Sequence, residues 1–261
     1  ELTNADAIHP GYGFLSENSD FSSICNDNNI VFIGPDAKTI DSMGNKSKAK
    51  ETMKNLGVPV IPGSEGLLTS VEDGIELAEQ IGYPVLIKAS SGGGGRGMRL
   101  VTSSEEFKNN YDNAKAEAKN AFNDDSVYLE KYFTNPKHIE FQIIGDNYGN
   151  AYSLFERECS LQRRHQKILE ESPSLALTDN IRKEMSDLSV HITKSIKYNG
   201  VGTIEYIYDT NTSKYYFMEM NTRIQVEHPV TEMVTGIDLI KQQIRMHAGK
   251  TFPKFLENFQ L

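Results

Sequence analysis

Polar side chains alternate with mostly apolar ones along residues 217–229, Phe-Met-Glu-Met-Asn-Thr-Arg-Ile-Gln-Val-Glu-His-Pro. Every second residue from Glu219 to Glu227 is polar or charged, in the order carboxylate, amide, arginine, amide, carboxylate. Because successive side chains of an extended chain point to opposite faces, we expect these groups to share one face. Carboxylates and amide oxygens bind divalent cations, and an arginine fork binds small anions. The alternative is the rim of a solvated strand, which would favour Thr, Lys and Glu without this mixture.

A short polar turn precedes this stretch and predicts a hairpin, with Thr-Asn-Thr-Ser-Lys between Asp209 and Tyr215. Two carboxylates that face each other across such a hairpin repel, and a divalent cation held by hard oxygen ligands removes that cost. Asn221 adds a further oxygen on the same face, so one or two Mg²⁺ ions fit better than zinc. The alternative is a solvated hairpin with a chance acidic pair. The pairs expected from a symmetric turn are Asp209 with Tyr215, Ile207 with Phe217, and Glu205 with Glu219.

Four consecutive glycines lie within residues 90–97, Ser-Ser-Gly-Gly-Gly-Gly-Arg-Gly, between two predicted strands. Glycine lets backbone N–H groups converge on an anion and permits positive φ. Lys88 ends the strand that enters the loop, where its ammonium group can reach a phosphate. The loop has neither the Gly-Lys-Ser/Thr end of a Walker motif nor the following helix of a dinucleotide fingerprint. We interpret it as a phosphate-covering hairpin, and the alternative is a flexible linker.

Positive charge gathers in residues 158–167, Glu-Cys-Ser-Leu-Gln-Arg-Arg-His-Gln-Lys. In a chain with a net charge of −9, such a segment is suited to a polyphosphate or a small anion. The alternative is an exposed basic turn. Cys159 is expected to be a small buried residue rather than a nucleophile.

The composition narrows the class of protein. The 261 residues are 38% hydrophobic and 24% charged, as in ordinary globular proteins. The net charge of −9 disfavours nucleic-acid binding, which depends on neutralising phosphates. The sequence shows no membrane-length apolar run and no export signal, and its two cysteines are too few for a disulfide framework. A reducing compartment is therefore expected. Because the chain begins at Glu1 rather than Met, we expect a piece of a longer protein.

The hydrophobic pattern predicts an α+β chain in four segments. Residues 1–45 have the features of the end of an α/β unit, and residues 46–61 contain a linker helix. Residues 62–133 form a small lid, and residues 134–261 are rich in strands. Helices are expected at 16–28, 46–56, 70–81, 103–121, 178–196 and 237–247, and strands at 30–33, 83–88, 98–101, 127–132, 139–144, 152–157, 166–170, 202–208 and 214–220.

Several motifs together resemble one family. They are His-Pro-Gly-Tyr-Gly-Phe-Leu-Ser-Glu-Asn at 9–18, the loop at 88–97, Glu-Lys-Tyr at 130–132, the basic segment at 158–167 and the stretch at 219–230. The combination resembles biotin carboxylase, an ATP-grasp enzyme found as a subunit of acetyl-CoA carboxylase and as a domain of related biotin-dependent carboxylases. The resemblance implies an α+β ATP-grasp fold with the tail of an N-terminal α/β domain and a glycine-loop lid. That family extends further in both directions, so the chain is expected to be truncated at both ends.

The resemblance also implies the roles of individual residues. Arg223, Glu227 and Lys167 are the implied catalytic residues, with Glu227 as the general base that deprotonates bicarbonate. The implied bicarbonate ligands are Lys167, Arg223, Gln225 and Val226, and the implied Mg²⁺ or Mn²⁺ ligands are Glu205, Glu219 and Asn221. The implied ATP contacts are Lys46, Lys88, Gly94, Gly95, Glu130, Lys131, Tyr132, Phe133, His138, Gln162, His165, Glu205 and Glu219.

The implied function is ATP-dependent carboxylation of biotin on biotin carboxyl carrier protein, with bicarbonate as the carbon source and carboxyphosphate as the intermediate. A carboxyltransferase would be the second partner, and a homodimer is expected for the full-length protein, with no nucleic acid and no membrane involved. The expected location is the cytoplasm, or the mitochondrial matrix or plastid in a eukaryote. The alternatives are another ATP-grasp ligase, such as a carbamoyl-phosphate-type synthetase, and a non-catalytic ATP-binding fragment.

Overall fold

The computed structural model describes residues 3–90, 97–164 and 166–252, and the chain divides into two compact units. The first unit contains Glu1–Val60 and Pro136–Leu261, and the second contains Ile61–Asn135. Both units combine helices with antiparallel sheets, which confirms the predicted α+β class. The division into four segments stays a prediction.

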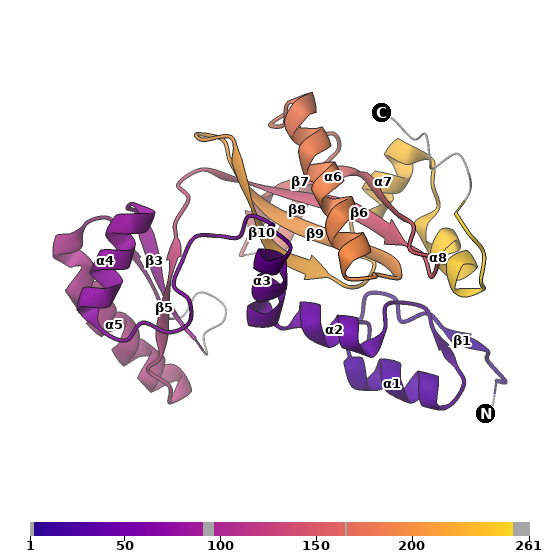
Figure 1. Ribbon diagram of the computed structural model, residues 1–261, viewed down its shortest axis with the longest axis horizontal. Coiled ribbons are helices and arrows are strands. Elements are labelled where there is room, and N and C mark those ends of the chain that lie inside the picture. Colours follow the sequence, from indigo (N-terminus) through magenta and orange to yellow (C-terminus); the bar gives the residue numbers. More distant parts are fainter. Residues whose placement is uncertain (1–2, 91–96, 165, 253–261) are drawn as a thin grey trace. The chain divides into compact units, whose positions relative to one another are not determined.

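A five-stranded antiparallel sheet forms the centre of the first unit, with strand order β10-β9-β6-β7-β8. Helix α6 (Asp179–Ser195) lies across one face of this sheet (Figure 1). It begins after Thr178, whose side chain accepts a hydrogen bond from the backbone of Ile181. The strands are β6 (Pro136–Gly145), β7 (Ala151–Arg163), β8 (Gln166–Glu171), β9 (Gly200–Asp209) and β10 (Lys214–Asn221).

The two faces of this sheet differ in polarity because side chains alternate along its central strands. The apolar face packs against α6 and contains Ile139, Phe141 and Ile143 of β6 together with Ile204, Tyr206 and Tyr208 of β9. The intervening residues point to the other face, where β6 presents His138, Glu140 and Gln142 and β9 presents Thr203 and Glu205. The core therefore uses one face and leaves a polar face for a site.

The turn between β9 and β10 is one residue shorter than the predicted turn. The Asp209 carboxylate accepts hydrogen bonds from Asn211 N at 3.1 Å and Thr212 Oγ1 at 2.7 Å. These bonds close the turn one residue earlier, so that Lys214 is already paired with Asp209. The observed pairs next to the turn are Asp209 with Lys214, Tyr208 with Tyr215, and Ile207 with Tyr216, so the predicted pairs of Asp209 with Tyr215 and of Ile207 with Phe217 are wrong.

A β-bulge at Met218 restores the predicted pairing at the far end of the hairpin. The register shifts by one residue between Phe217 and Glu219, and Glu219 then pairs with Glu205. Phe217 is buried in the apolar core, whereas Glu219 shares the polar face with Glu205. The two carboxylates therefore face each other as predicted, although for a reason that the turn sequence does not reveal.

Shorter elements complete the first unit. β1 (Ala7–Ile8) and β2 (Val31–Phe32) form a parallel pair. Helix α3 contacts β10, and α8 contacts β9. Two of its helices, α2 and α7, were not predicted, because each has only eight residues. The helices are α1 (Ser19–Asp27), α2 (Ala37–Gly44), α3 (Lys46–Asn55), α7 (His228–Thr235) and α8 (Leu239–His247).

The second unit is a three-stranded antiparallel sheet, in the order β4-β3-β5, with two helices. Helix α4 packs against α5 around a core that includes Phe107. Gly74 is required at this contact, since a Cβ atom there would lie 2.5 Å from the Phe107 ring. The elements are α4 (Val71–Ile81), β3 (Val85–Ala89), β4 (Met98–Val101), α5 (Ser104–Phe122) and β5 (Val127–Lys131).

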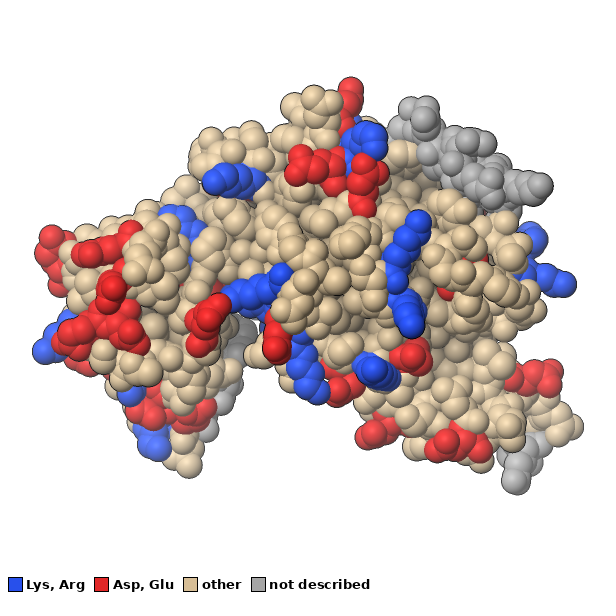
Figure 2. Space-filling model, in the orientation of Figure 1, with Lys and Arg blue, Asp and Glu red and all other residues tan. Residues whose placement is uncertain are grey.

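Acidic side chains gather on the outer surface of α4 and α5, as Figure 2 shows for the second unit. Helix α4 contains Glu72, Asp73, Glu76 and Glu79 and no basic residue. Such a negatively charged surface disfavours polyphosphates, and the predicted phosphate ligand Lys88 lies on β3 instead. Within the described part of the chain, no helix combines the length and the apolar character needed to span a membrane.

Candidate active site

Four charged side chains form one row across the polar face of the five-stranded sheet. Glu140 of β6 pairs directly with Arg157 of β7 on one side and with Glu205 of β9 on the other. Glu205 in turn pairs with Glu219 of β10. Neighbouring strands lie about 4.8 Å apart, so these groups must interact. Three carboxylates in adjacent positions require positive charge to be stable.

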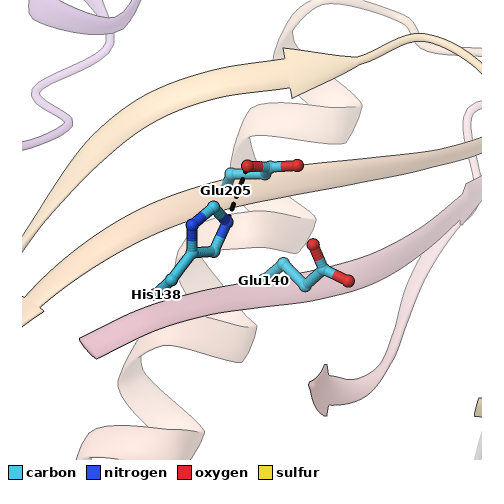
Figure 3. A group of neighbouring side chains, drawn as sticks. All are labelled: His138, Glu140 and Glu205. Carbon is cyan, nitrogen blue, oxygen red and sulfur yellow. Dashed lines mark ion pairs between the residues drawn. The ribbon is translucent and has the colours of Figure 1, made fainter. Parts of the chain in front are cut away.

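Glu205 is the most heavily bonded carboxylate of the row. It is almost fully buried and accepts hydrogen bonds from Lys167 Nζ at 2.9 Å, Asn221 Nδ2 at 2.8 Å and Gln225 Nε2 at 2.9 Å. His138 Nε2 lies 2.7 Å from its second oxygen, although not aligned as a hydrogen bond (Figure 3). Burial raises the pKa of Glu205, but His138 and Lys167 outweigh it and lower the pKa to about 2. The carboxylate therefore stays ionised at neutral pH.

Lys167 supplies the positive charge between the carboxylates. Its ammonium group contacts Glu140, lies 2.9 Å from Glu205 and lies 2.7 Å from Glu227. Burial opposes the charged form of Lys167, but these carboxylates outweigh burial and raise its pKa. The pKa of Glu227 is lowered: burial raises it, and the bond from Lys167 outweighs that effect. The structure thus brings Lys167 and Glu227 into direct contact, and their catalytic roles stay predictions.

Arg157 and Glu140 are site residues that the sequence did not identify. Both side chains are fully buried, and Arg157 Nε donates to Glu140 at 2.6 Å. The alternation of His138, Glu140 and Gln142 with apolar residues along β6 indicates a polar face. The pairing of β6 with β7, which brings Arg157 to Glu140, cannot be inferred from the residues of either strand alone. The other acceptors of Arg157 are Gln142 at 2.7 Å, Thr231 at 2.8 Å, Gln225 at 3.1 Å and Thr203 at 3.4 Å.

The stretch after β10 does not remain extended. β10 ends at Asn221, the chain then bends, and Glu227 becomes the residue before α7 with φ −81° and ψ 4°. The expectation that an extended chain places all five polar residues on one face is therefore wrong beyond Asn221. The bend nevertheless brings Gln225 and Glu227 to Glu205 and Lys167, because it turns the chain back over the polar face.

Arg223 is partly exposed at this bend. Its Nε donates to Glu17 at 2.9 Å, and its terminal nitrogens donate to the Ile224 carbonyl and Asn221 Oδ1, each at 3.2 Å. An arginine has five N–H donors, so hydrogens on its terminal nitrogens remain for an anion. The nitrogen of the Asn221 amide faces Glu205 and its oxygen faces Arg223. The role of Asn221 as a metal ligand stays a prediction.

The donor set at the outer end of the row fits a divalent cation. Glu205 and Glu219 present carboxylates across one pair of strands, which is the hard oxygen chemistry that Mg²⁺ and Mn²⁺ prefer. Lys46 Nζ lies 3.5 Å from Glu219, and its side chain is 85% exposed. A second group of possible ligands, His138, Glu140 and Glu205, is less suitable, because Lys167 already contacts both of its carboxylates.

Gln162 belongs to the same site through His138. Its amide nitrogen lies 3.1 Å from His138 Nδ1 and 3.0 Å from the Cys159 carbonyl. An amide nitrogen donates, so Nδ1 accepts and the proton of a neutral His138 ring is on Nε2, facing Glu205. Cys159 is fully buried, and burial is the largest cause of its raised pKa, which agrees with the predicted structural role.

Predicted ATP contacts of the second unit lie on neighbouring strands. Lys88 Nζ of β3 lies 2.7 Å from a carboxylate oxygen of Glu130 on β5. Burial lowers the pKa of Lys88, but Glu130 outweighs it and the pKa is raised. Lys131 donates to the carbonyls of Gly82 at 2.7 Å and Tyr83 at 3.2 Å, so its ammonium group is bound within the unit.

The remaining predicted residues have less definite surroundings. Gly94, Gly95 and His165 lie outside the described residues. Tyr132 donates its backbone N–H to the Pro84 carbonyl, Phe133 is buried, and the Val226 side chain is exposed. A cavity of about 350 Å³ at the end of α6, lined by Asp146, Lys194, Tyr198 and their neighbours, contains no predicted site residue.

Comparisons with known proteins show which family this chain resembles. The model of the carbamoyl-phosphate synthase L chain, ATP-binding domain, matches residues 45–255, and that of the biotin carboxylase N-terminal domain matches residues 1–40. Biotin carboxylase 1 of Bacillus subtilis is 55% identical over 249 residues, which are 95% of this chain and 55% of that protein. The chain thus spans about half the length of the curated relatives that it matches.

Two solved structures show the same fold. The biotin carboxylase domain dimer of Hydrogenobacter thermophilus 2-oxoglutarate carboxylase, in complex with MgADP, ADP and bicarbonate, is 54% identical with a TM-score of 0.81, over 96% of this chain and 55% of that one. Biotin carboxylase from Campylobacter jejuni in its β,γ-ATP complex is 51% identical with a TM-score of 0.83, over 97% and 56% of the two chains. With its motifs, its fold and these matches in agreement, the chain belongs to the biotin carboxylase family of ATP-grasp proteins.

Proposed function

We propose that this chain carries the ATP- and bicarbonate-binding part of an enzyme that carboxylates biotin. The observation that supports this most directly is the position of Glu205 between two sets of residues. It faces the predicted metal ligand Glu219 on one side and accepts hydrogen bonds from the predicted bicarbonate ligands Lys167 and Gln225 on the other. On this proposal, a single carboxylate would connect the site of a nucleotide-bound metal with the site of a one-carbon anion.

The metal would be Mg²⁺ or Mn²⁺ held by Glu205 and Glu219. Among the described residues, the carboxylates of Glu140, Glu205, Glu219 and Glu227 form ion pairs with Arg157, Lys167 and Lys46, and His138 lies beside Glu205. This concentration of carboxylates supports a further cation. When bound, the metal supplies neutralisation of the phosphate charge during phosphoryl transfer.

Bicarbonate would be held by the Arg223 fork and deprotonated by Glu227. A planar guanidinium matches the planar anion through two parallel hydrogen bonds, which the ammonium group of a lysine cannot provide. The lowered pKa of Glu227 keeps it ionised and able to accept a proton at neutral pH. Lys167 contacts Glu227 directly and also holds it in position.

The deprotonated bicarbonate oxygen would then attack the γ-phosphorus of ATP. The bond from this phosphorus to the β–γ bridging oxygen breaks, ADP leaves, and carboxyphosphate is formed. Carboxyphosphate cleaves between carbon and the bridging oxygen into CO₂ and phosphate. The carbon of CO₂ bonds to the ureido nitrogen of biotin, and the proton of that nitrogen passes to the released phosphate. In the second unit, Lys88 lies beside Glu130, and its ammonium group would bind a phosphate of ATP.

The partners proposed for the whole protein are biotin carboxyl carrier protein and a carboxyltransferase, which would choose the acyl acceptor. A homodimer is proposed because the Hydrogenobacter thermophilus domain forms a dimer. The cytoplasm stays the proposed location, with the mitochondrial matrix or plastid as the eukaryotic equivalents, since relatives include chloroplastic and mitochondrial proteins.

The experiment that tests this function traces the oxygen atoms of bicarbonate by isotope labelling. The chain is incubated with ATP, Mg²⁺, free biotin and ¹⁸O-labelled bicarbonate, and the released phosphate is analysed by mass spectrometry. Transfer of one ¹⁸O atom into phosphate, dependent on bicarbonate, is expected from carboxyphosphate. A requirement for ammonia with carbamoyl phosphate as product would favour the other ATP-grasp ligase, and ATP binding without turnover would favour a binding fragment.

A further inference from the structure

The N-terminal motif at 9–18 contains a carboxylate that the proposed mechanism has not used. We propose that Glu17 is a positioning residue that fixes the orientation of the Arg223 guanidinium, so that this arginine presents a ready-made fork to the bicarbonate anion. The inference rests on the proposed function of Arg223 and adds a residue that none of the predicted site assignments includes.

Both oxygens of Glu17 are used at the bend after β10. Oε2 accepts a hydrogen bond from Arg223 Nε at 2.9 Å, and Oε1 accepts from Thr222 N at 3.0 Å and Thr222 Oγ1 at 3.3 Å. One carboxylate therefore binds the guanidinium and the backbone that carries it. These contacts join parts of the first unit that are about 205 residues apart in the chain.

The bond at Nε determines which side of the guanidinium is free. Nε points to Glu17, and the two terminal nitrogens each donate one hydrogen bond, to the Ile224 carbonyl and to Asn221. Among the described residues, no further acceptor contacts Arg223, so one hydrogen on each terminal nitrogen is left. The pair suits an anion that accepts two bonds at once, which is the geometry of a carboxylate-like oxygen pair.

The loop that carries Glu17 is fixed independently of Arg223. Asn18 caps α1 by accepting from Phe21 N at 2.7 Å, and Ser16 N donates to the Gly13 carbonyl at 3.0 Å. At the other end of the motif, His9 Nε2 lies 3.0 Å from Oε1 of Gln243, a buried residue of α8. Glu17 is thus held from both sides, so it can orient Arg223 rather than follow it, which is the condition for preorganisation.

Charge and orientation predict opposite effects of Glu17 on anion binding. A carboxylate 2.9 Å from the guanidinium reduces the positive potential that attracts bicarbonate. If charge were its only influence, removing it would improve binding. If it acts by orientation, removing it weakens binding, because the guanidinium becomes free to rotate. Whether removal of the Glu17 charge strengthens or weakens bicarbonate binding therefore distinguishes an effect of charge from an effect of orientation.

The first measurement is the steady-state kinetics of bicarbonate-dependent ATPase activity. Glu17→Gln keeps the shape but weakens the clamp, and we expect the KM for bicarbonate to rise about 3- to 10-fold, with the KM for ATP within about twofold of wild type. Asp20→Asn, an exposed acid in the first turn of α1, is the matched control for net charge. An unchanged or lower bicarbonate KM in Glu17→Gln overturns the proposal.

A double-mutant cycle tests whether Glu17 acts through Arg223. In an Arg223→Lys background, which retains positive charge but has no Nε–H fork, Glu17→Gln should change the bicarbonate KM by less than about twofold. The same fold-change in both backgrounds would show that Glu17 acts by another route and would overturn the proposal.

A second readout does not depend on turnover. The Arg223 Nε–H resonance, assigned by its loss in Arg223→Lys, should move and exchange faster with water in Glu17→Gln, while thermal unfolding confirms that the variant is folded. If wild type lacks bicarbonate-dependent activity but this resonance responds, the proposed function fails and the positioning contact stands. If wild type is active and the resonance does not respond, the positioning role is wrong and the function stands.

Discussion

Glu140 pairs directly with Glu205 across strands β6 and β9, and both carboxylates share the ammonium group of Lys167. Like charges in directly opposite positions destabilise a sheet. The central strands therefore depend on the cations beside them, and the site residues are also stability residues. This dependence leads to predictions that can be measured without any assay of turnover.

Acid should destabilise the protein through Glu205. Its folded pKa is about 2, compared with an ordinary value of 4.5. The unfolded state therefore binds the proton more tightly, so this contribution to stability is present above about pH 4.5 and is lost as the pH falls toward 2. In urea unfolding between pH 7 and pH 3, we expect Glu205→Gln to lose less stability than wild type. The full contribution of Glu205 to the free energy of unfolding is roughly 3 kcal/mol.

The control for this prediction is Glu51→Gln, an exposed substitution on α3, which should show the same pH dependence of stability as wild type. Parallel pH curves for wild type and Glu205→Gln would contradict the assignment to Glu205.

Removing the buried Arg157 should destabilise the fold strongly. Arg157→Met leaves Glu140 buried with only Lys167 as a counter-charge, and the loss of one partner of a buried pair costs about 3–5 kcal/mol. The free energy of unfolding in urea measures this cost. Arg245→Met, at an exposed position on α8, should change it by less than about 0.5 kcal/mol.

The double variant Arg157→Met/Glu140→Gln makes the test specific. Neutralising Glu140 removes the uncompensated charge, so the double variant should recover part of the lost stability. If the destabilising effects of the two substitutions are instead additive, the ion pair between Arg157 and Glu140, at 2.6 Å, does not contribute to stability as proposed.

Glu227→Gln should separate nucleotide binding from chemistry. The glutamine has nearly the same shape but cannot take the bicarbonate proton, and the loss of a general base lowers a rate by about 10²–10⁴-fold. ATP affinity, measured by calorimetry, should stay within a few-fold of wild type. Turnover of bicarbonate-dependent ATP hydrolysis close to the wild-type rate would show that Glu227 is not the base.

Divalent metal should be required, and Glu219 should set the concentration that is needed. Chelation with EDTA is expected to abolish ATP turnover, and added Mg²⁺ or Mn²⁺ should restore it. Glu219→Gln removes one of the two facing carboxylates, so half-maximal activity should need at least about tenfold more Mg²⁺. Asp41→Asn, at an exposed pair with Lys48, is the matched control. An unchanged Mg²⁺ requirement in Glu219→Gln would exclude this residue as a ligand.

Much of the fold could be read from local patterns. Asn45, Ser70 and Thr178 lie at the predicted starts of three helices, and each accepts a backbone hydrogen bond there as a cap residue. These signals are local, because a cap and its donor lie three residues apart. The facing pair of Glu205 and Glu219 was also found, since one hairpin joins them.

The residues that were missed depend on pairing between distant strands. Glu140 reaches Glu205 only through the alignment of β6 with β9, about 65 residues later in the chain. Arg157 and Glu17 acquire their roles in the same way, from partners that no spacing rule connects to them. The bend after Asn221 was missed because an alternating sequence is equally compatible with a strand and with a turn that returns over the sheet.

The bulge at Met218 has a consequence for how this hairpin can tolerate change. The apolar core takes Phe217 and Met220, and the extra residue between them inverts the parity of the strand, so that Glu219 leaves the core. If Met218 instead occupied an ordinary paired position, strict alternation from Phe217 would turn the Glu219 carboxylate toward the apolar side chains. The residues before and after Met218 therefore follow two alternation patterns, and the pattern after Met218 places Glu219 on the polar face. Deleting Met218 would remove the bulge and leave Phe217, Glu219 and Met220 in regular alternation, so that Phe217 and Met220 would still face the core and Glu219 would still lie on the polar face.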